Sequence, residues 1–483
     1  MAQREEDIRG DYNSLLDTQR HSSRTYRIHK YALACSVLAS ANSILLGYDI
    51  GVMSGAVMYI REDLKISQTE VEILVGCLNM CSLLGSLVSG VAADALGRRA
   101  TIFLAANTFL LGAVLMAFAP SFVVLISGRV VSGIGVGCSL TTSPLYTSEI
   151  SPESSRGLLS SLPEIFINVG ILLGYTLNYS LSALPESVNW RLMLGAAAFP
   201  ALAVSFSIHF LPESPRWLVM KGRVDEARRV IMLTDSGADA DARTREILNA
   251  KAKSGAWGEI IRRPSPAVKR MLIAAVGINF FMQASGNDAV VYYTPQVLGG
   301  AGISEKRTLM GITILMGLTK TSVCVVSALF SDRYGRRPLL LLGCAGMGFS
   351  LCVLGFGTKY LESSSGESFW AVAVCVVAIC ADLSFFSLGL GPITWVYSSE
   401  IFPTRIRAVG TCVAVSVNRL VSGVVAMTFL SFASLVSFGC VFFVFAGVMA
   451  VAFVFVYYFL PETKEKTLEE IASLFGDDEL YVN

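Results

Sequence analysis

The chain has 483 residues, of which 53% are hydrophobic and 16% are charged, and its formal net charge is +1. Soluble folds do not need many uninterrupted apolar runs of about 18 residues or more, so this composition indicates a polytopic membrane protein. The balanced charge gives no reason to expect a nucleic-acid partner. The 11 cysteines lie almost wholly inside apolar runs, where they are expected to pack helices rather than to form disulfides or bind a metal.

About twelve apolar runs are long enough to cross a bilayer, because roughly 20 helical residues suffice. They lie near residues 31–58, 71–92, 100–119, 122–146, 158–181, 190–211, 268–298, 308–331, 338–360, 369–397, 407–434 and 436–460. The expected organisation is an N-terminal tail over 1–30, a first six-helix bundle over 31–211, a linker with short helices over 212–267, a second bundle over 268–460 and a C-terminal tail over 461–483.

Basic residues predict the orientation in the membrane. They are concentrated in the segment from Pro212 to Lys269 and in every second loop, whereas the opposite loops are short or of mixed charge. The positive-inside rule then places both tails and the central segment in the cytoplasm.

Three motifs of the first half recur in the second half in the same order. Asp94-Ala-Leu-Gly-Arg-Arg recurs at Asp332, Glu149-Ile-Ser-Pro recurs at Glu400, and Pro212-Glu-Ser recurs at Pro461. Each pair is separated by roughly 240–250 residues. This repeat predicts an all-α integral membrane protein whose twelve transmembrane helices form two six-helix bundles in parallel orientation.

The first span contains one acidic residue, Asp49, beside three glycines one turn apart. A carboxylate at the centre of a membrane helix costs about 2.5–3.5 kcal/mol on insertion scales, so Asp49 is expected to face a partner or a wet cavity. Arg129, the only basic residue in the fourth span, is the natural partner. The alternative is that Arg129 extends its side chain to the membrane surface.

The repeated motifs place acidic and basic residues together at the cytoplasmic helix ends. Arginines alone would serve as topology signals, but acidic residues contribute little to topology. We therefore expect ion pairs that link the two bundles and act as a cytoplasmic gate. The gate residues are Asp94, Arg98, Glu149, Arg156, Glu213, Arg216, Asp332, Arg336, Glu400, Arg407 and Glu462.

A second polar set lies inside the spans. Asn279, Gln283 and Asn287 form a stripe on one face of the seventh span, which Gly286 and Pro295 are expected to break. Amides, carboxylates and a tryptophan around one cavity suit a ligand with many hydroxyls, although any single member could instead form a structural bond between helices. The other members are Glu164, Asp288, Lys320, Asp382, Trp395, Asn418 and Arg419, and Lys320 is expected to pair with Asp288.

Several motifs together resemble the sugar porter family of the major facilitator superfamily. They are Gly47-Tyr48-Asp49, both Gly-Arg-Arg loops, Pro212-Glu-Ser-Pro-Arg-Trp217, Gly391-Pro-Ile-Thr-Trp395 and Pro461-Glu-Thr-Lys464, and they extend over nearly the whole chain. Phe281 through Pro295 and Val417-Asn418-Arg419 are most similar to plant polyol and monosaccharide proton symporters.

The resemblance implies the major facilitator fold, with Asp49 as proton acceptor and Arg129 as its counter-ion. It also implies sugar contacts at Gln283, Asp288, Trp395 and Asn418, and it places Glu164 where hexose porters usually have glutamine. One departure is Met282, which stands where most members have the first of two glutamines. Asn287, at a position that is usually apolar, is expected to compensate.

The expected function is proton-coupled import of a polyol or monosaccharide by alternating access, without enzymatic activity and with no cofactor besides the proton. A facilitative uniporter is the alternative within transport, and a membrane sugar sensor is the alternative from another class. The expected partners are the small-molecule substrate and the lipid bilayer, and a monomer should suffice. The plasma membrane is the expected location, although Asp11-x-x-x-Leu15-Leu16 resembles a sorting signal that leaves the vacuolar membrane open.

Overall fold

The computed structural model describes residues 30–151, 156–234, 240–251, 264–300, 303, 305–363, 369–403, 406–464 and 474–476. The sorting motif at Asp11–Leu16 and most of both tails lie outside these ranges. Twelve helical segments among the described residues are long and apolar enough to cross a membrane, which confirms the predicted number of spans.

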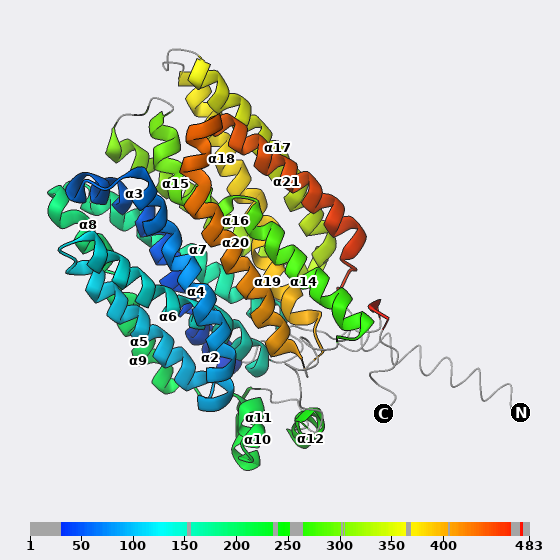
Figure 1. Ribbon diagram of the computed structural model, residues 1–483. Helices are drawn as coiled ribbons and strands as arrows, with labels where there is room; N and C mark the ends of the chain where they lie inside the picture. Colours follow the sequence, from blue (N-terminus) through cyan, green and yellow to red (C-terminus); the bar gives the residue numbers. More distant parts are fainter. Residues whose placement is uncertain are drawn as a thin grey trace, which may run out of the picture.

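The first half of the chain forms the N bundle (Figure 1). Its helices are α2 (Lys30–Ser40), α3 (Ser43–Leu64), α4 (Gln68–Leu96), α5 (Arg98–Ala117), α6 (Phe122–Ile150), α7 (Arg156–Leu181), α8 (Glu186–Gly195) and α9 (Ala198–Ser207). The second half forms the C bundle, with α14 (Pro266–Ala284), α15 (Asn287–Gly300), α16 (Lys306–Tyr334), α17 (Arg336–Ser363), α18 (Phe369–Leu388), α19 (Leu390–Glu400), α20 (Arg407–Val436) and α21 (Phe438–Phe459).

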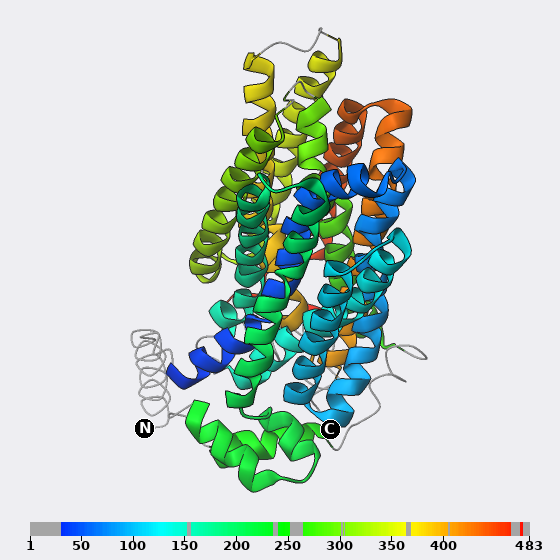
Figure 2. The ribbon, with the colours of Figure 1, turned by 90° about the vertical axis from the view of Figure 1, so that its left-hand side faces the viewer.

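Three short helices connect the two bundles in the sequence. In space they lie beyond one end of the membrane helices, as Figure 2 shows in green. They are α10 (Pro215–Met220), α11 (Val224–Thr234) and α12 (Ala240–Lys251). Leu218, Val219, Ala227 and Val230 form a small apolar core between them. We call this end of the molecule the inner end, because the positive-inside rule assigns it to the cytoplasm.

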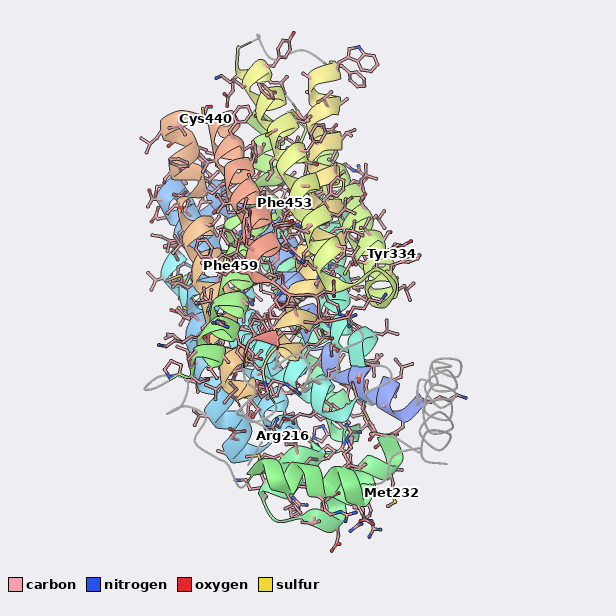
Figure 3. The ribbon with its side chains drawn as sticks, turned by 90° about the vertical axis from the view of Figure 1, so that its right-hand side faces the viewer. Arg216, Met232, Tyr334, Cys440, Phe453 and Phe459 are labelled. Atoms are coloured by element: carbon pink, nitrogen blue, oxygen red, sulfur yellow. The ribbon has the colours of Figure 1, made fainter. Side chains whose placement is uncertain are left out.

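Many large apolar side chains on the outside of the bundles are exposed. Phe349 and Phe356 on α17 are 72% and 68% exposed, and Phe459 is 56% exposed. Figure 3 shows Phe453 and Phe459 along α21, between Cys440 toward the outer end and Arg216 and Met232 at the inner end. Such a belt suits a surrounding bilayer, because lipid tails are as apolar as these side chains.

Glycines bring the first and fifth spans into close contact. A Cβ atom on Gly47 would lie 1.9 Å from the carbonyl oxygen of Ile167, and one on Gly51 would lie 2.3 Å from that of Ile171. No other residue type fits at such a backbone approach. This contact places Asp49, between the two glycines, deep inside the N bundle.

Two spans of the C bundle are broken near the centre of the molecule. The seventh span breaks between α14 and α15 at Gly286, whose φ is +79°, which confirms the predicted break. Pro295, by contrast, lies inside α15 without interrupting it. The tenth span breaks at Gly389, between α18 and α19, which we did not predict. Asn287 and Asp288 follow the first break directly, and Trp395 lies on the helix that follows the second.

Candidate transport site

Asp49 and Arg129 form a buried ion pair in the N bundle. The Arg129 Nη1 atom lies 2.5 Å from Asp49 Oδ1 and 2.7 Å from Oδ2, and the two residues are 0% and 2% exposed, respectively. Arg129 also donates from Nε to the Leu74 carbonyl at 3.0 Å and from Nη2 to the Val75 carbonyl at 3.3 Å. The arginine therefore points into the bundle and does not extend to the membrane surface.

Helix α15 of the C bundle packs against α3 beside this pair. Tyr292 on α15 is fully buried and close enough to interact electrostatically with both Asp49 and Arg129. A change in the charge of Asp49 therefore alters the electrostatic environment of Tyr292 in the other bundle.

Glu164 and Trp395 join the two bundles at the centre of the molecule. The Trp395 indole donates from Nε1 to Glu164 Oε2 at 2.9 Å, from α19 to α7. Asn168, one turn later on α7, lies 3.3 Å from the other carboxylate oxygen. Glu164 is 3% exposed, so it presents an acceptor inside the protein at the interface between the bundles.

A cluster of amides from α14 and α20 lies on the C-bundle side of this interface. The Asn418 side chain donates to Asn279 Oδ1 at 3.4 Å and to the sulfur of Met282 at 3.4 Å. Asn279 donates in turn to Ser398 Oγ at 2.9 Å. Gln283 lies within hydrogen-bond distance of Asn418, Asp288 and Arg419. Met282 is 3% exposed, so its sulfur lies at a buried position among these amides.

Asp288 and Lys320 do not form the ion pair that we expected. Asp288 accepts from Ser422 Oγ at 2.6 Å and from Asn287 Nδ2 at 3.2 Å. The Lys320 ammonium lies 3.5 Å from Asn287 Oδ1 instead. The physical reason is the Asn287 amide, which lies between the two groups: it donates to Asp288 from Nδ2 and accepts from Lys320 at Oδ1.

The inner end of the N bundle gathers the motif residues into one network. The Arg98 guanidinium lies 3.0 Å from both Asp94 Oδ1 and Glu149 Oε2. The backbone N–H groups of Arg98 and Arg99 donate to Glu213 Oε1 at 2.9 and 3.3 Å. Gly97 has a φ of +101°, and a Cβ atom there would lie 2.4 Å from Glu213. The glycine therefore makes the turn that exposes these N–H groups.

The C bundle repeats this network with equivalent residues. The Arg336 guanidinium lies 3.0 Å from Glu400 Oε1, and the N–H groups of Arg336 and Arg337 each donate to Glu462 at 2.9 Å. Thr463 donates to Glu400 at 2.9 Å, as Ser214 donates to Glu149 in the N bundle.

These described ion pairs connect helices of the same bundle, whereas we expected pairs between bundles. The repeated glycine turns point each acid at the loop of its own half, which explains the difference. Arg216 on α10 interacts electrostatically with Glu149, and the Arg407 guanidinium donates to the Phe402 carbonyl at 3.2 Å. The side chains of Arg156 and Asp332 lie outside the described residues.

Sequence reasoning missed the contacts that join the bundles at the outer end. Lys306 at the start of α16 pairs with Glu62 of α3 and, at 3.2 Å, with Glu186 of α8. Its ammonium also lies 4.9 Å from the centre of the Tyr59 ring. We call this set the outer clamp. Its loops read as mixed charge and carry no repeat, so only their tertiary proximity identifies the clamp.

The bundles touch on both sides of the central site. Toward the outer end, Glu72 of α4 accepts from the N–H of Ser431 on α20 at 2.7 Å. Toward the inner end, the hydroxyls of Ser86 on α4 and Ser416 on α20 lie 3.2 Å apart. The central polar residues are thus enclosed between two layers of contacts, as in a transporter that opens to one side at a time.

Two repeated bundles, a buried ion pair and a polar site between them define a multi-pass membrane transporter. Residues 35–475 match the family model described as "Sugar (and other) transporter". The chain belongs to this sugar transporter family of the major facilitator superfamily.

Known relatives agree with this assignment. The chain is 46% identical to "Probable polyol transporter 6" of Arabidopsis thaliana over 470 residues, which cover 93% of this chain and 95% of the relative. It is also 46% identical to "Polyol transporter 5" of the same plant over 467 residues, which cover 93% and 87% of the two chains. It is therefore similar to transporters of small polyhydroxylated molecules.

Solved structures of the proton:xylose symporter XylE have the same fold. The form bound to 6-bromo-6-deoxy-D-glucose matches with a TM-score of 0.81 and 25% identity, covering 93% of this chain and all of that one. The inward-open form of the xylose transporter XylE from E. coli matches with a TM-score of 0.74 and 25% identity, covering 92% and 99%.

Proposed function

We propose that this transporter is a proton-coupled symporter that imports a polyol or monosaccharide by alternating access. The single observation that carries the coupling is the buried Asp49–Arg129 ion pair. Such a pair is a two-state element, because a proton on Asp49 removes the charge that holds Arg129. The names of the relatives, which include a proton:xylose symporter, support the same proposal.

Protonation of Asp49 acts on the contact between the bundles. Arg129 keeps its bonds to the Leu74 and Val75 carbonyls, so the arginine stays in place while Asp49 loses its ion pair. Asp49 lies on α3, which packs against α15 near Tyr292. We infer that neutralisation loosens the α3–α15 contact, and this change permits the bundles to rock.

The central polar residues bind the hydroxyl groups of the substrate. Glu164 and Asp288 accept hydrogen bonds, the amides of Gln283, Asn287 and Asn418 both donate and accept, and the Trp395 ring offers an apolar face. Met282 lacks the second amide, so a substrate without the matching hydroxyl leaves no buried group unpaired. The site is therefore expected to accept both polyols and monosaccharides.

An isosteric change at Asp49 tests the coupling. In proteoliposomes, Asp49→Asn should abolish accumulation of radiolabelled sorbitol or xylose driven by a pH gradient, while exchange at equal pH on both sides persists. Asp63→Asn is the matched control, since Asp63 lies on the same helix but pairs with Arg191 at the outer end. Accumulation by Asp49→Asn against a gradient would mean that Asp49 does not couple transport to protons.

The same experiment separates the alternatives. A uniporter would show no accumulation in the unmutated protein, and a sensor would show no exchange at all. We further propose that the monomer is the transporting unit, that the proton is the only coupling ion and that the plasma membrane is the site of action. A fluorescent fusion with and without the Leu15-Leu16 pair would distinguish the plasma membrane from the vacuolar membrane.

The inner networks of both bundles are proposed to stabilise the state that is closed toward the cytoplasm. Each network fixes the ends of several helices of its own bundle, so that the bundle moves as a rigid body. In this proposal, the gate residues act by holding each bundle together at its inner end rather than by tying one bundle to the other.

A further inference from the structure

A buried carboxylate on α18 takes no part in the ion pair or the substrate contacts described above. Asp382 is 0% exposed, and neither of its side-chain oxygens has a hydrogen-bond partner among the described residues. An isolated buried carboxylate is strongly disfavoured, because a charge in a low-dielectric interior loses its hydration without compensation. Asp382 therefore needs either a cation or a proton.

The cation that acts on Asp382 is Lys320 of the neighbouring helix α16. Lys320 is 4% exposed, and its ammonium lies 4.9 Å from the centre of the Phe386 ring, one turn from Asp382 on α18. On the other side, the ammonium is 3.5 Å from Asn287 Oδ1. Lys320 thus lies between Phe386 of α18 and Asn287 of the substrate site, and no ion pair within 4 Å joins it to a carboxylate among the described residues.

Three carboxylates compete for this single ammonium group: Asp382, Glu164 and Asp288. Asp288 is linked to a second cation through a side-chain amide: in the orientation that satisfies both ends, Gln283 donates to Asp288 Oδ2 at 2.9 Å and accepts from Arg419 Nη2 at 2.8 Å. The charge of Lys320 is then shared between two carboxylates, Glu164 and Asp382. One proton would balance the cluster, and Asp382 is the member without hydrogen bonds.

The helices around α18 supply no second cation that acts on Asp382 among the described residues. Helices α15, α16, α17 and α19 pack against α18. The titratable groups on their buried faces, apart from Lys320, are Cys324 on α16, Arg336 and Cys344 on α17, Asp288, Tyr292 and Tyr293 on α15, and Tyr397 on α19. Arg336 is the one cation among these groups, and it pairs with Glu400 at the inner end. The charge state of Asp382 is therefore set against Lys320.

We propose that Asp382 and Lys320 form a second titratable pair that makes substrate affinity depend on pH, separately from Asp49. A protonated Asp382 leaves Lys320 at the substrate site, where its ammonium donates to a substrate hydroxyl beside Glu164. An ionised Asp382 draws Lys320 away along its flexible stem. Affinity then falls as the pH rises, because the site loses a charged donor. The affinity effect rests on the proposed function, whereas the protonation of Asp382 does not.

Infrared spectroscopy tests the protonation without any substrate. Proteoliposomes titrated with acid should show the C=O band of a protonated carboxyl group that is absent from the Asp382→Asn variant. Ser384→Ala is the matched control, because Ser384 lies on the same helix and donates only to the Cys380 carbonyl of its own helix. A band that persists unchanged in Asp382→Asn would overturn the proposal, whatever the protein transports.

Equilibrium exchange of radiolabelled sorbitol, with equal pH on both sides, tests the effect on affinity. The KM of the unmutated protein should rise by about fivefold from mildly acidic to mildly alkaline pH, equivalent to ~1 kcal/mol. Asp382→Asn should keep the low KM throughout, Asp382→Glu should restore the pH dependence, and Lys320→Met should have a high KM at every pH. At alkaline pH, Lys320→Met should abolish the effect of Asp382→Asn on KM in the double variant, and effects that simply add at this pH would overturn the pairing.

The two proposals fail in different ways. If sorbitol and xylose are not exchanged at all, the proposed function is wrong, while the infrared band still reports on Asp382. If Asp382→Asn loses accumulation driven by a pH gradient, Asp382 belongs to the coupling itself and the separate role is wrong. If the KM of the unmutated protein and that of Asp382→Glu do not change with pH, the Asp382–Lys320 pair does not control substrate affinity.

Discussion

Removal of the Lys306 ammonium should open the outer side of the transporter. Lys306 is the only member of the outer clamp on the C bundle, and its described partners Glu62, Glu186 and Tyr59 are all on the N bundle. Lys306→Ala therefore deletes every described contact of the clamp at once. The expected result is a larger population of the state in which the outer ends of the bundles are apart.

The exposure of the clamp sets the size of this effect. The side chains of Lys306, Glu62 and Glu186 are 33%, 46% and 52% exposed, so solvent screens both ion pairs. Exposed ion pairs contribute roughly 0.2–1 kcal/mol each, which gives about 1 kcal/mol for the clamp. That free energy corresponds to about a fivefold change in the ratio of the two states. High salt should reduce the difference between variant and unmutated protein.

Distances between spin labels measure the two populations directly. Leu184 at the outer end of the N bundle and Tyr360 at the outer end of α17 are both exposed and can carry nitroxides in a background without the native cysteines. Lys306→Ala should increase the fraction of long distances. Lys65→Gln is the matched control, since Lys65 is an exposed lysine at the same end of the molecule.

Two outcomes would contradict the reasoning. An unchanged distance distribution at low salt would mean that the clamp does not stabilise outer closure. An equal shift in Lys65→Gln would mean that net charge at the outer surface, rather than the clamp, controls the equilibrium. A charge exchange, Lys306→Glu with Glu62→Lys, should restore part of the short-distance population.

Two further predictions concern substrate choice and the inner end. Met282→Gln gives Asn418 an amide oxygen in place of sulfur and should tighten hexose binding by about 1 kcal/mol, the net worth of one hydrogen bond. Competition among glucose, xylose, sorbitol and mannitol measures this change, and an unaltered ranking would contradict it. Gly335→Ala places a Cβ atom 2.8 Å from Glu462 at a φ of +91° and should destabilise the protein by roughly 1–3 kcal/mol. A thermal unfolding scan detects this loss, which Gly447→Ala should not show, because nothing lies within 4 Å of a Cβ atom at Gly447.

Properties that depend on neighbours in the sequence could be predicted from the sequence. Membrane spans follow from runs of apolar residues, because a bilayer requires about 20 of them per helix. The break at Gly286 follows from a residue that tolerates positive φ, and the close packing at Gly47 and Gly51 follows from their spacing. The repeated loop motifs predicted two equivalent halves, and the structure shows equivalent networks at Arg98 and Arg336.

The choice of partners was decided only by the tertiary structure. Charge and spacing indicate that Lys320 needs an acid, but three carboxylates on different helices act on it electrostatically, and the Asn287 amide lies between it and the expected partner Asp288. In the same way, the motif acids could have bound either half, and the glycine turns directed each to its own bundle. The outer clamp joins residues that are more than a hundred positions apart and share no motif. Which side chains pair over long range depends on how the helices and bundles pack together. The sequence pattern of a single helix does not specify that packing.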